Sequence, residues 1–301
     1  MRRLRNWLEA LLDRAPADDR SSSRPWRLGL AATLFVAIVI WAYVSWDGQL
    51  DVDWWLAVVL LTVGMPAAIC LVGWEQYLAY ALAGQSRGIV HSIEVGIGAS
   101  AANLLPIPGA LIVRATALKQ AGASLKRSVG ITTLLGILWL AVTSLFVGLA
   151  VVPASAVIGL SMCVIGLVVS FAVVGVLRRR LDAPTALLSQ CVLAVALKVV
   201  VTALNLWLAY RVLGVAIDVS GAVIVSSAGV IATAAGFFPG GLGLWELLSS
   251  VFARISGYES SEAVLATATV RVAWIMALAL AWLAVNVALM RQSHRRAAAD
   301  T

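Results

Sequence analysis

The chain has 301 residues, of which 61% are hydrophobic and 12% are charged, and its formal net charge is +7. A soluble domain has about a quarter charged residues, so this composition excludes an ordinary soluble domain and predicts an all-α integral membrane protein. The basic residues stand at the ends of apolar segments, which indicates a membrane topology and excludes a nucleic-acid-binding surface.

Residues 1–25 form a basic N-terminal arm that precedes the first long apolar segment. Five apolar side chains of this arm share one face of a helix, and these are Leu4, Trp7, Leu8, Leu11 and Leu12. Their spacing is typical of an amphipathic helix that lies on an anionic inner leaflet, although a tail without a specific role fits the same residues. Residues 15–25 contain two prolines and three serines, so we expect a linker there.

Six apolar segments are long enough to cross a bilayer, which requires about 20 residues of α-helix. They are residues 26–46, 54–83, 128–152, 155–177, 185–212 and 262–290. Together they predict a single transmembrane domain over 26–290, followed by a basic tail at 291–301. Two shorter apolar stretches, within 88–122 and 220–256, interrupt this series and differ from the spans.

Each of these two stretches is broken in its middle by proline and glycine. The first break reads Asn103-Leu-Leu-Pro106-Ile-Pro-Gly109, and the second reads Phe-Phe-Pro239-Gly240-Gly241-Leu-Gly243. Proline removes a backbone donor and glycine leaves the backbone uncovered. In hydrocarbon such backbone is tolerated only where protein or a water-filled cavity surrounds it. Matching breaks in two halves of a membrane protein indicate a transport site, and we expect a helical hairpin at each.

The charged residues predict how these segments alternate across the membrane. With six spans and two hairpins, the basic clusters fall on the cytoplasmic side, as do both termini. They are the arginines within 2–27, Arg87, Lys119, Lys126, Arg127, Arg178, Arg179, Arg180, Arg291, Arg295 and Arg296. Each hairpin either re-enters on one side or crosses twice, since both preserve this pattern. The order predicts an inverted repeat, 26–152 and 155–290, in a bacterial inner membrane.

Three ionisable residues fall deep in apolar sequence, where a charge is costly and usually functional. Arg114 follows the first break, Glu246 follows the second, and Arg271 lies deep in the last span. Two interpretations are open. Glu246 and Arg271 form a purely structural ion pair, or Arg114 or Arg271 contacts an anionic head group, assisted by the free N–H donors of the helices that begin at the breaks.

Other ionisable residues in the apolar sequence are weaker candidates for the transport site. His91 and Glu94 are three residues apart, as in a helix-face pair, so they are candidates for a proton relay or for a structural hydrogen bond. We expect Glu75, Lys198 and Arg254 to lie near an interface, with their charged groups reaching toward water.

The sequence contains no pattern typical of an enzyme. It has no Gly-x-Ser-x-Gly element and no phosphate-binding loop, and with two histidines it offers no metal-ligand spacing. We therefore predict neither a catalytic residue nor a metal or other cofactor.

Three elements resemble the transmembrane flippase region of the lysylphosphatidylglycerol synthases and their stand-alone relatives. They are the first break with Arg114, the second break with Glu246, and Arg271 in the last span, and the resemblance covers about 26–290. It implies lipid movement between leaflets through a groove at the breaks. The residues it assigns to that groove are Asn103, Pro106, Gly109, Arg114, Pro239, Gly240, Gly241, Gly243, Glu246 and Arg271. The lysine-transferring domain of the large members has no counterpart here, so aminoacylation is not implied.

The sequence therefore predicts a membrane lipid transporter whose substrate has an anionic or zwitterionic head group. Two alternatives are open: a secondary transporter of a small solute, and a non-catalytic membrane subunit of a lipid-modifying or envelope-assembly complex. Membrane lipids are the expected partners, with a second copy of the chain or a membrane enzyme as further candidates.

Overall fold

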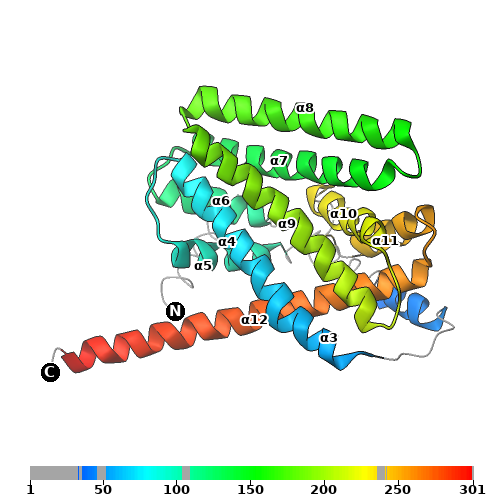
Figure 1. Ribbon diagram of the computed structural model, residues 1–301. Coiled ribbons are helices and arrows are strands. Elements are labelled where there is room, and N and C mark those ends of the chain that lie inside the picture. Colours follow the sequence, from blue (N-terminus) through cyan, green and yellow to red (C-terminus); the bar gives the residue numbers. More distant parts are fainter. Residues whose placement is uncertain are drawn as a thin grey trace.

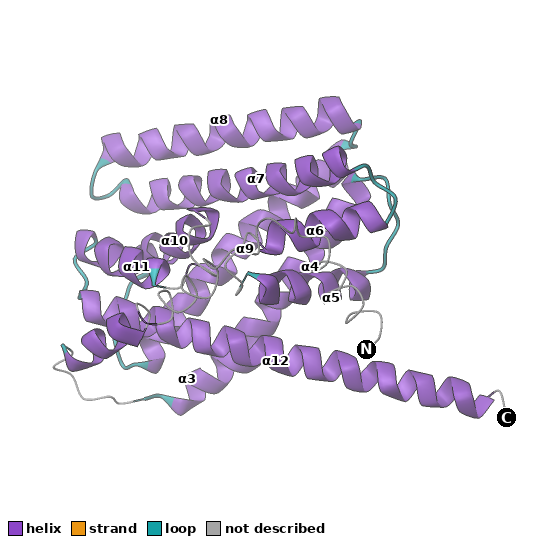
Figure 2. Ribbon diagram, turned by 180° about the vertical axis from the view of Figure 1, so that it is seen from behind, coloured by secondary structure: helices purple, strands orange, loops and turns teal. Residues whose placement is uncertain are grey.

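The computed structural model describes residues 33, 36–45, 52–103, 109–235, 241 and 243–299, with side chains to residue 284 and residue 235 described by its backbone. Within these ranges the protein is helical and no strand occurs (Figures 1 and 2). The helices are α3 (Trp54–Val59), the π-helix η2 (Leu60–Gly64), α4 (Met65–Leu82), α5 (Ile89–Ala102), α6 (Gly109–Gln120), α7 (Leu125–Val151), α8 (Ala156–Leu181), α9 (Thr185–Val212), α10 (Val219–Ala235), α11 (Leu244–Ile255) and α12 (Ser260–Ala299).

Five of the described helical segments are long and apolar enough to cross a membrane. They are Trp54–Leu82, Leu125–Val151, Ala156–Leu181, Thr185–Val212 and Ser260–Ala284. They confirm five of the six predicted spans, whereas most of the predicted span 26–46 lies outside the described residues, of which 36–44 are helical. The arm at 1–25 also lies outside them. The predicted tail at 291–301 is helical to Ala299, because α12 continues without a break.

The loops gather at two opposite ends of the molecule, and the described basic clusters gather at one of them. There Arg127 Nη2 donates to the Leu82 carbonyl at 3.0 Å and ties the start of α7 to the end of α4. A core cluster at this end joins Leu82 with Leu118 of α6 and Leu177 of α8. The basic end defined in this way holds Arg87, Lys119, Lys126, Arg127, Arg178, Arg179 and Arg180.

The opposite end carries Asp53, Asp218, Glu259 and Glu262, and also Arg211 and Arg254. We call it the acidic end. A backbone hydrogen bond of 3.0 Å from the Asp53 amide to the Val212 carbonyl joins α3 to α9 there. The Arg211 guanidinium lies over the Trp207 ring, 5.3 Å from its centroid. Arg254 is exposed at this end, which agrees with its predicted place near an interface.

Each broken stretch forms two short helices that pack against each other, α5 against α6 and α10 against α11. The first pair begins and ends at the basic end, between α4 and α7. The second pair begins and ends at the acidic end, between α9 and α12 (Figure 1). The two pairs therefore enter the fold from opposite ends, which is the arrangement that the sequence predicts for an inverted repeat.

Helices α7 and α8 form an antiparallel pair along one side of the molecule (Figures 1 and 2). Glycines allow their backbones to approach closely, as small residues do between helices in membranes. A Cβ atom at Gly159 would lie 2.6 Å from the Val152 amide nitrogen, and one at Gly166 would lie 2.6 Å from the Ala141 carbonyl oxygen. The outer face of α8 is apolar, with Val157 and Phe171 about three quarters exposed.

Candidate functional site

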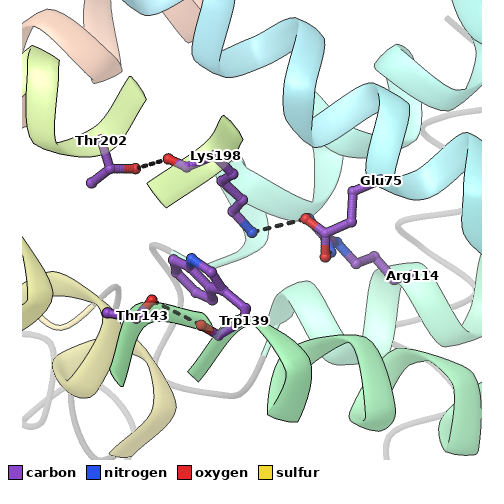
Figure 3. A network of polar contacts seen from close by, with 6 residues as sticks. All are labelled: Glu75, Arg114, Trp139, Thr143, Lys198 and Thr202. Atoms are coloured by element: carbon purple, nitrogen blue, oxygen red, sulfur yellow. Dashed lines mark hydrogen bonds and ion pairs between the residues drawn. The ribbon is translucent and has the colours of Figure 1, made fainter. Parts of the chain in front are cut away.

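A buried ionic cluster joins the three helices α4, α6 and α9 (Figure 3). Glu75 of α4 accepts hydrogen bonds at both carboxylate oxygens, from Arg114 Nη1 of α6 at 2.7 Å and from Lys198 Nζ of α9 at 2.8 Å. Glu75 is 4% exposed, and the side chains of Arg114 and Lys198 are each 15% exposed. We call these three residues the Glu75 cluster.

Trp139 of α7 adds an aromatic wall to this cluster. The Lys198 ammonium lies 3.8 Å from the centroid of the Trp139 ring, within the range of a cation–π interaction. Thr143 and Thr202 stand nearby in Figure 3, but their hydroxyls donate to the Trp139 and Lys198 carbonyls of their own helices. The cluster therefore brings together side chains from four helices, with two positive charges and one negative charge.

The cluster lies well inside the helices. At about 1.5 Å of rise per residue, Lys198 is about 20 Å from the start of α9, and Trp139 is about 20 Å from the start of α7. Both positions are close to the middle of their helices. Glu75 lies about 10 Å from the last residue of α4, and Arg114 lies about 10 Å from the last residue of α6. Both helices end at the basic end, and the two side chains extend from there toward the middle of α9.

The sequence-based expectation for Glu75 and Lys198 is therefore wrong. Neither reaches toward water at an interface, because each neutralises part of the other's charge inside the protein. The partner of Arg114 is likewise Glu75, 39 residues earlier, rather than a residue of its own hairpin. One sequence signal pointed to this outcome: Lys198 stands near the centre of an apolar run of 28 residues, too far from either end to reach water easily.

A second ionic pair lies at the second break. Glu246 Oε1 accepts from Arg271 Nε of α12 at 2.8 Å, and Glu246 Oε2 accepts from the Gly243 amide at 2.8 Å. The Glu246 carboxylate thereby caps the start of α11, where a negative charge is favoured by the free amides. Arg271 is 5% exposed and Glu246 is fully buried. The pair is neutral, which both interpretations of it allow.

Other contacts of this pair fix the break itself. Arg271 Nη2 donates to the Gly241 carbonyl at 3.5 Å, and the Arg271 guanidinium lies 5.0 Å from the Trp245 ring centroid. Gly241 and Gly243 have φ values of 67° and 76°, a region that favours glycine. Trp245 Nε1 and Ser249 Oγ are buried without a hydrogen-bond partner among the described residues.

Two of the predicted site residues of the first break have structural contacts. Asn103 Oδ1 accepts the Ala110 amide at 2.9 Å and so spans the break from α5 to α6. Gly109 lies so close to the Ala102 carbonyl that a Cβ atom there would collide with it. Pro106, Pro239 and Gly240 lie outside the described residues.

The predicted helix-face pair of His91 and Glu94 forms at the start of α5. His91 Nδ1 and Glu94 Oε2 are 3.5 Å apart, and the two side chains are 48% and 34% exposed. On the other side of its ring, His91 Nε2 is 3.4 Å from the Tyr80 hydroxyl. This row of polar groups lies toward the basic end and has no described contact with the Glu75 cluster, so the structure favours neither the relay nor the structural hydrogen bond.

A cavity at the basic end lies apart from these clusters. An open cavity of about 650 Å³ is lined by Gly175, Arg178, Arg179, Asp182 and Ala183 at the basic end, and it contains none of the predicted site residues. Among the described residues no group of three or more His, Cys, Asp or Glu is placed to hold a metal ion.

Comparison with known proteins found no family model that matches the chain and no curated protein that matches it.

Proposed function

We propose that this protein moves an amphipathic lipid, or a lipid-linked molecule, between the leaflets of a membrane. One observation carries the proposal: two broken helix pairs enter from opposite ends, and each brings buried charge toward the middle of the fold. Charged groups at membrane depth, beside helices that break, are typical of a transport pathway.

In this proposal the pairs α5–α6 and α10–α11 are re-entrant hairpins within a six-span inverted repeat. The basic end faces the cytoplasm, because positive residues concentrate on that side of bacterial inner-membrane proteins. The polar head group passes along the breaks and the ionic clusters while the acyl chains stay in the bilayer. The resemblance to the flippase region of the lysylphosphatidylglycerol synthases supports the same reading, since it rests on the same two breaks and on Arg114, Glu246 and Arg271.

The test is leaflet-to-leaflet movement of a fluorescent phospholipid in proteoliposomes that contain the purified full-length protein. The variant is Gly241→Leu, which places a side chain at a positive φ and against Ala232, where even a Cβ atom would lie 3.0 Å from the Ala232 Cβ. The control is Gly257→Leu, which imposes the same backbone strain at φ 83° in a loop with open space.

We expect the wild-type protein and Gly257→Leu to move the lipid, and Gly241→Leu to lose most of this movement while it still inserts. Equal movement by all three would show that the second break is only a turn. If no variant moves lipid and the wild-type protein takes up a soluble anion, the protein is a secondary transporter. A protein that moves neither, but retains a lipid-modifying enzyme on purification, is a membrane subunit.

A further inference from the structure

We propose that Arg114, Lys198 and Trp139 form the head-group site of the transported lipid, and that this site takes an anionic phosphodiester in exchange for Glu75. The inference rests on the proposed function and names its substrate class. Its first basis is the net charge of the Glu75 cluster. The Glu75 cluster holds two cations and one carboxylate, all largely buried, so it carries one surplus positive charge. The pair of Glu246 and Arg271 has no such surplus.

The surplus charge coincides with unused hydrogen-bond donors. Arg114 Nε and Trp139 Nε1 are buried and have no hydrogen-bond partner among the described residues. Both atoms can only donate, so an acceptor is what would satisfy them. Trp245 Nε1 is also unpartnered at the second pair, but the charge there is already balanced. Surplus positive charge and unpartnered donors occur together at the Glu75 cluster, and an anion with several oxygen acceptors fits both.

The geometry of Arg114 suits the phosphate of a phospholipid. Glu75 engages Nη1 and leaves the Nε edge of the guanidinium. That edge presents two parallel N–H donors, which match two oxygens of a phosphate or carboxylate. Lys198 adds a point charge on the other side of Glu75, as Figure 3 shows. A phosphodiester carries one negative charge, which equals the surplus of the cluster.

The same count disfavours a zwitterionic head group. Its ammonium or choline group would bring a further cation to a cluster that already has one too many. We therefore commit to an anionic glycerophospholipid, for which phosphatidylglycerol is the probe, over phosphatidylcholine.

In this scheme Glu75 is an internal counter-ion that occupies the cations when no phosphate is bound. The phosphate competes with the carboxylate, so Glu75 weakens binding and permits release. The sign of this effect is diagnostic. Glu75→Gln leaves two cations without an acid and should bind phosphatidylglycerol more tightly, whereas a purely structural cluster would lose stability and gain no affinity.

The experiment measures binding of short-chain phosphatidylglycerol, short-chain phosphatidylcholine and glycerol phosphate to the full-length protein in neutral detergent, by calorimetry. We expect phosphatidylglycerol to bind more tightly than phosphatidylcholine by about tenfold or more, the effect of a charge-assisted hydrogen bond. Lys198→Gln and Arg114→Gln should remove that preference. Glu75→Gln should strengthen binding, and Glu75→Gln/Lys198→Gln, which restores a surplus of one, should return it toward the wild-type value.

The control is Arg254→Gln, which removes an exposed cation at the acidic end, outside the Glu75 cluster, and should leave the preference unchanged. Equal binding of the two lipids, or weaker binding by Glu75→Gln, would overturn the inference. Tight binding of glycerol phosphate with no contribution from the acyl chains would also overturn it, in favour of a soluble anion. Lipid movement that is indifferent to head-group charge would refute this inference and leave the proposed function standing. Phosphatidylglycerol binding without lipid movement would refute the function instead.

Discussion

At the scale of single residues, the two ionic clusters differ in how completely their members satisfy one another. Both oxygens of Glu246 are used, by Arg271 and by the Gly243 amide, and the pair is neutral. Both oxygens of Glu75 are also used, but two cations share them. Both clusters are largely buried, but they differ in net charge. The first arrangement is what a structural pair requires, and the second leaves a positive charge available.

Removing one member of the neutral pair should be costly. Glu246→Gln or Arg271→Gln leaves a buried charge without its partner, which costs about 3–5 kcal/mol in soluble proteins. We expect each single variant to melt at a lower temperature in detergent, and the double variant to recover much of the loss. If the double variant also recovers lipid movement, the pair is structural. If it recovers stability without movement, one of the two residues takes part in transport.

Asp218 predicts a dependence of stability on pH at the acidic end. Its carboxylate accepts the Gly221 amide at 2.6 Å and the Tyr258 hydroxyl at 2.8 Å, and it caps the start of α10. The Gly221 amide, and then the Tyr258 hydroxyl, hold the pKa of Asp218 below its usual value. The resulting stability is present above the ordinary pKa of about 3.9 and is lost as the pH falls toward the lower folded-state value.

We expect the melting temperature of the wild-type protein to fall between about pH 5 and pH 3 more steeply than that of Asp218→Asn, which keeps a capping oxygen without the titration. Tyr258→Phe, which removes one donor, should lie between them. At neutral pH, Asp218→Ala should cost about 0.5–2 kcal/mol, as other lost caps do. Identical acid profiles for the wild-type protein and Asp218→Asn would contradict this account.

At the scale of elements, the contact of α7 with α8 depends on the absence of side chains. A Cβ atom at Gly166 would meet the backbone of α7, whereas one at Gly136 of α7 would meet open space. Gly166→Ala should therefore destabilise the protein by about 1–3 kcal/mol through overpacking. Gly136→Ala should be neutral or stabilising by up to about 1 kcal/mol, because alanine is the better helix former. Melting curves in detergent test this opposite sign, and equal effects would show that the glycines are interchangeable.

The helices were easier to predict than the side-chain contacts between them. Runs of apolar residues and the proline–glycine breaks predicted six spans and two interrupted stretches, and five of the spans and both helix pairs occur among the described residues, because helix length and interruption are local properties. The Glu75 cluster was missed, since its members are 39 and 123 residues apart and meet only through the crossing of α4, α6 and α9. Asn103 shows the same limit within one break: its type suited a polar site, yet its oxygen accepts the Ala110 amide.

At the scale of the whole molecule, the proposed topology predicts which loops are reachable from outside a cell. Cys70, Cys163 and Cys191 are replaced first, so that labelling comes only from the single introduced cysteine. A membrane-impermeant maleimide added to intact cells should label Ser260→Cys at the acidic end and miss Ser124→Cys at the basic end. After the cells are opened, both should react. Labelling of both positions in intact cells would refute the inverted repeat.

The π-helix η2 has a consequence for how the chain tolerates changes in length. A π-turn contains one residue more than an α-turn. If that residue were removed and the turn became α-helical, the helices on either side would keep the same relative rotation. Pro66 stands two residues after the end of η2, and Asn205 Nδ2 donates to the Gly64 carbonyl at 3.2 Å within this turn. Deletion of Leu61 should therefore convert η2 to ordinary helix and leave Glu75 facing Arg114 and Lys198.

A one-residue deletion in the α-helical part of the same span cannot be absorbed by a π-turn. Loss of Leu71 would rotate everything before it by about 100° relative to Glu75 and turn the packed face of α3 away from α9. We expect the protein without Leu61 to insert and to elute as a single species, and the protein without Leu71 to aggregate. Size-exclusion chromatography of the two one-residue deletions measures this difference. A span that carries a spare residue at one defined turn can lose that residue and keep its fold.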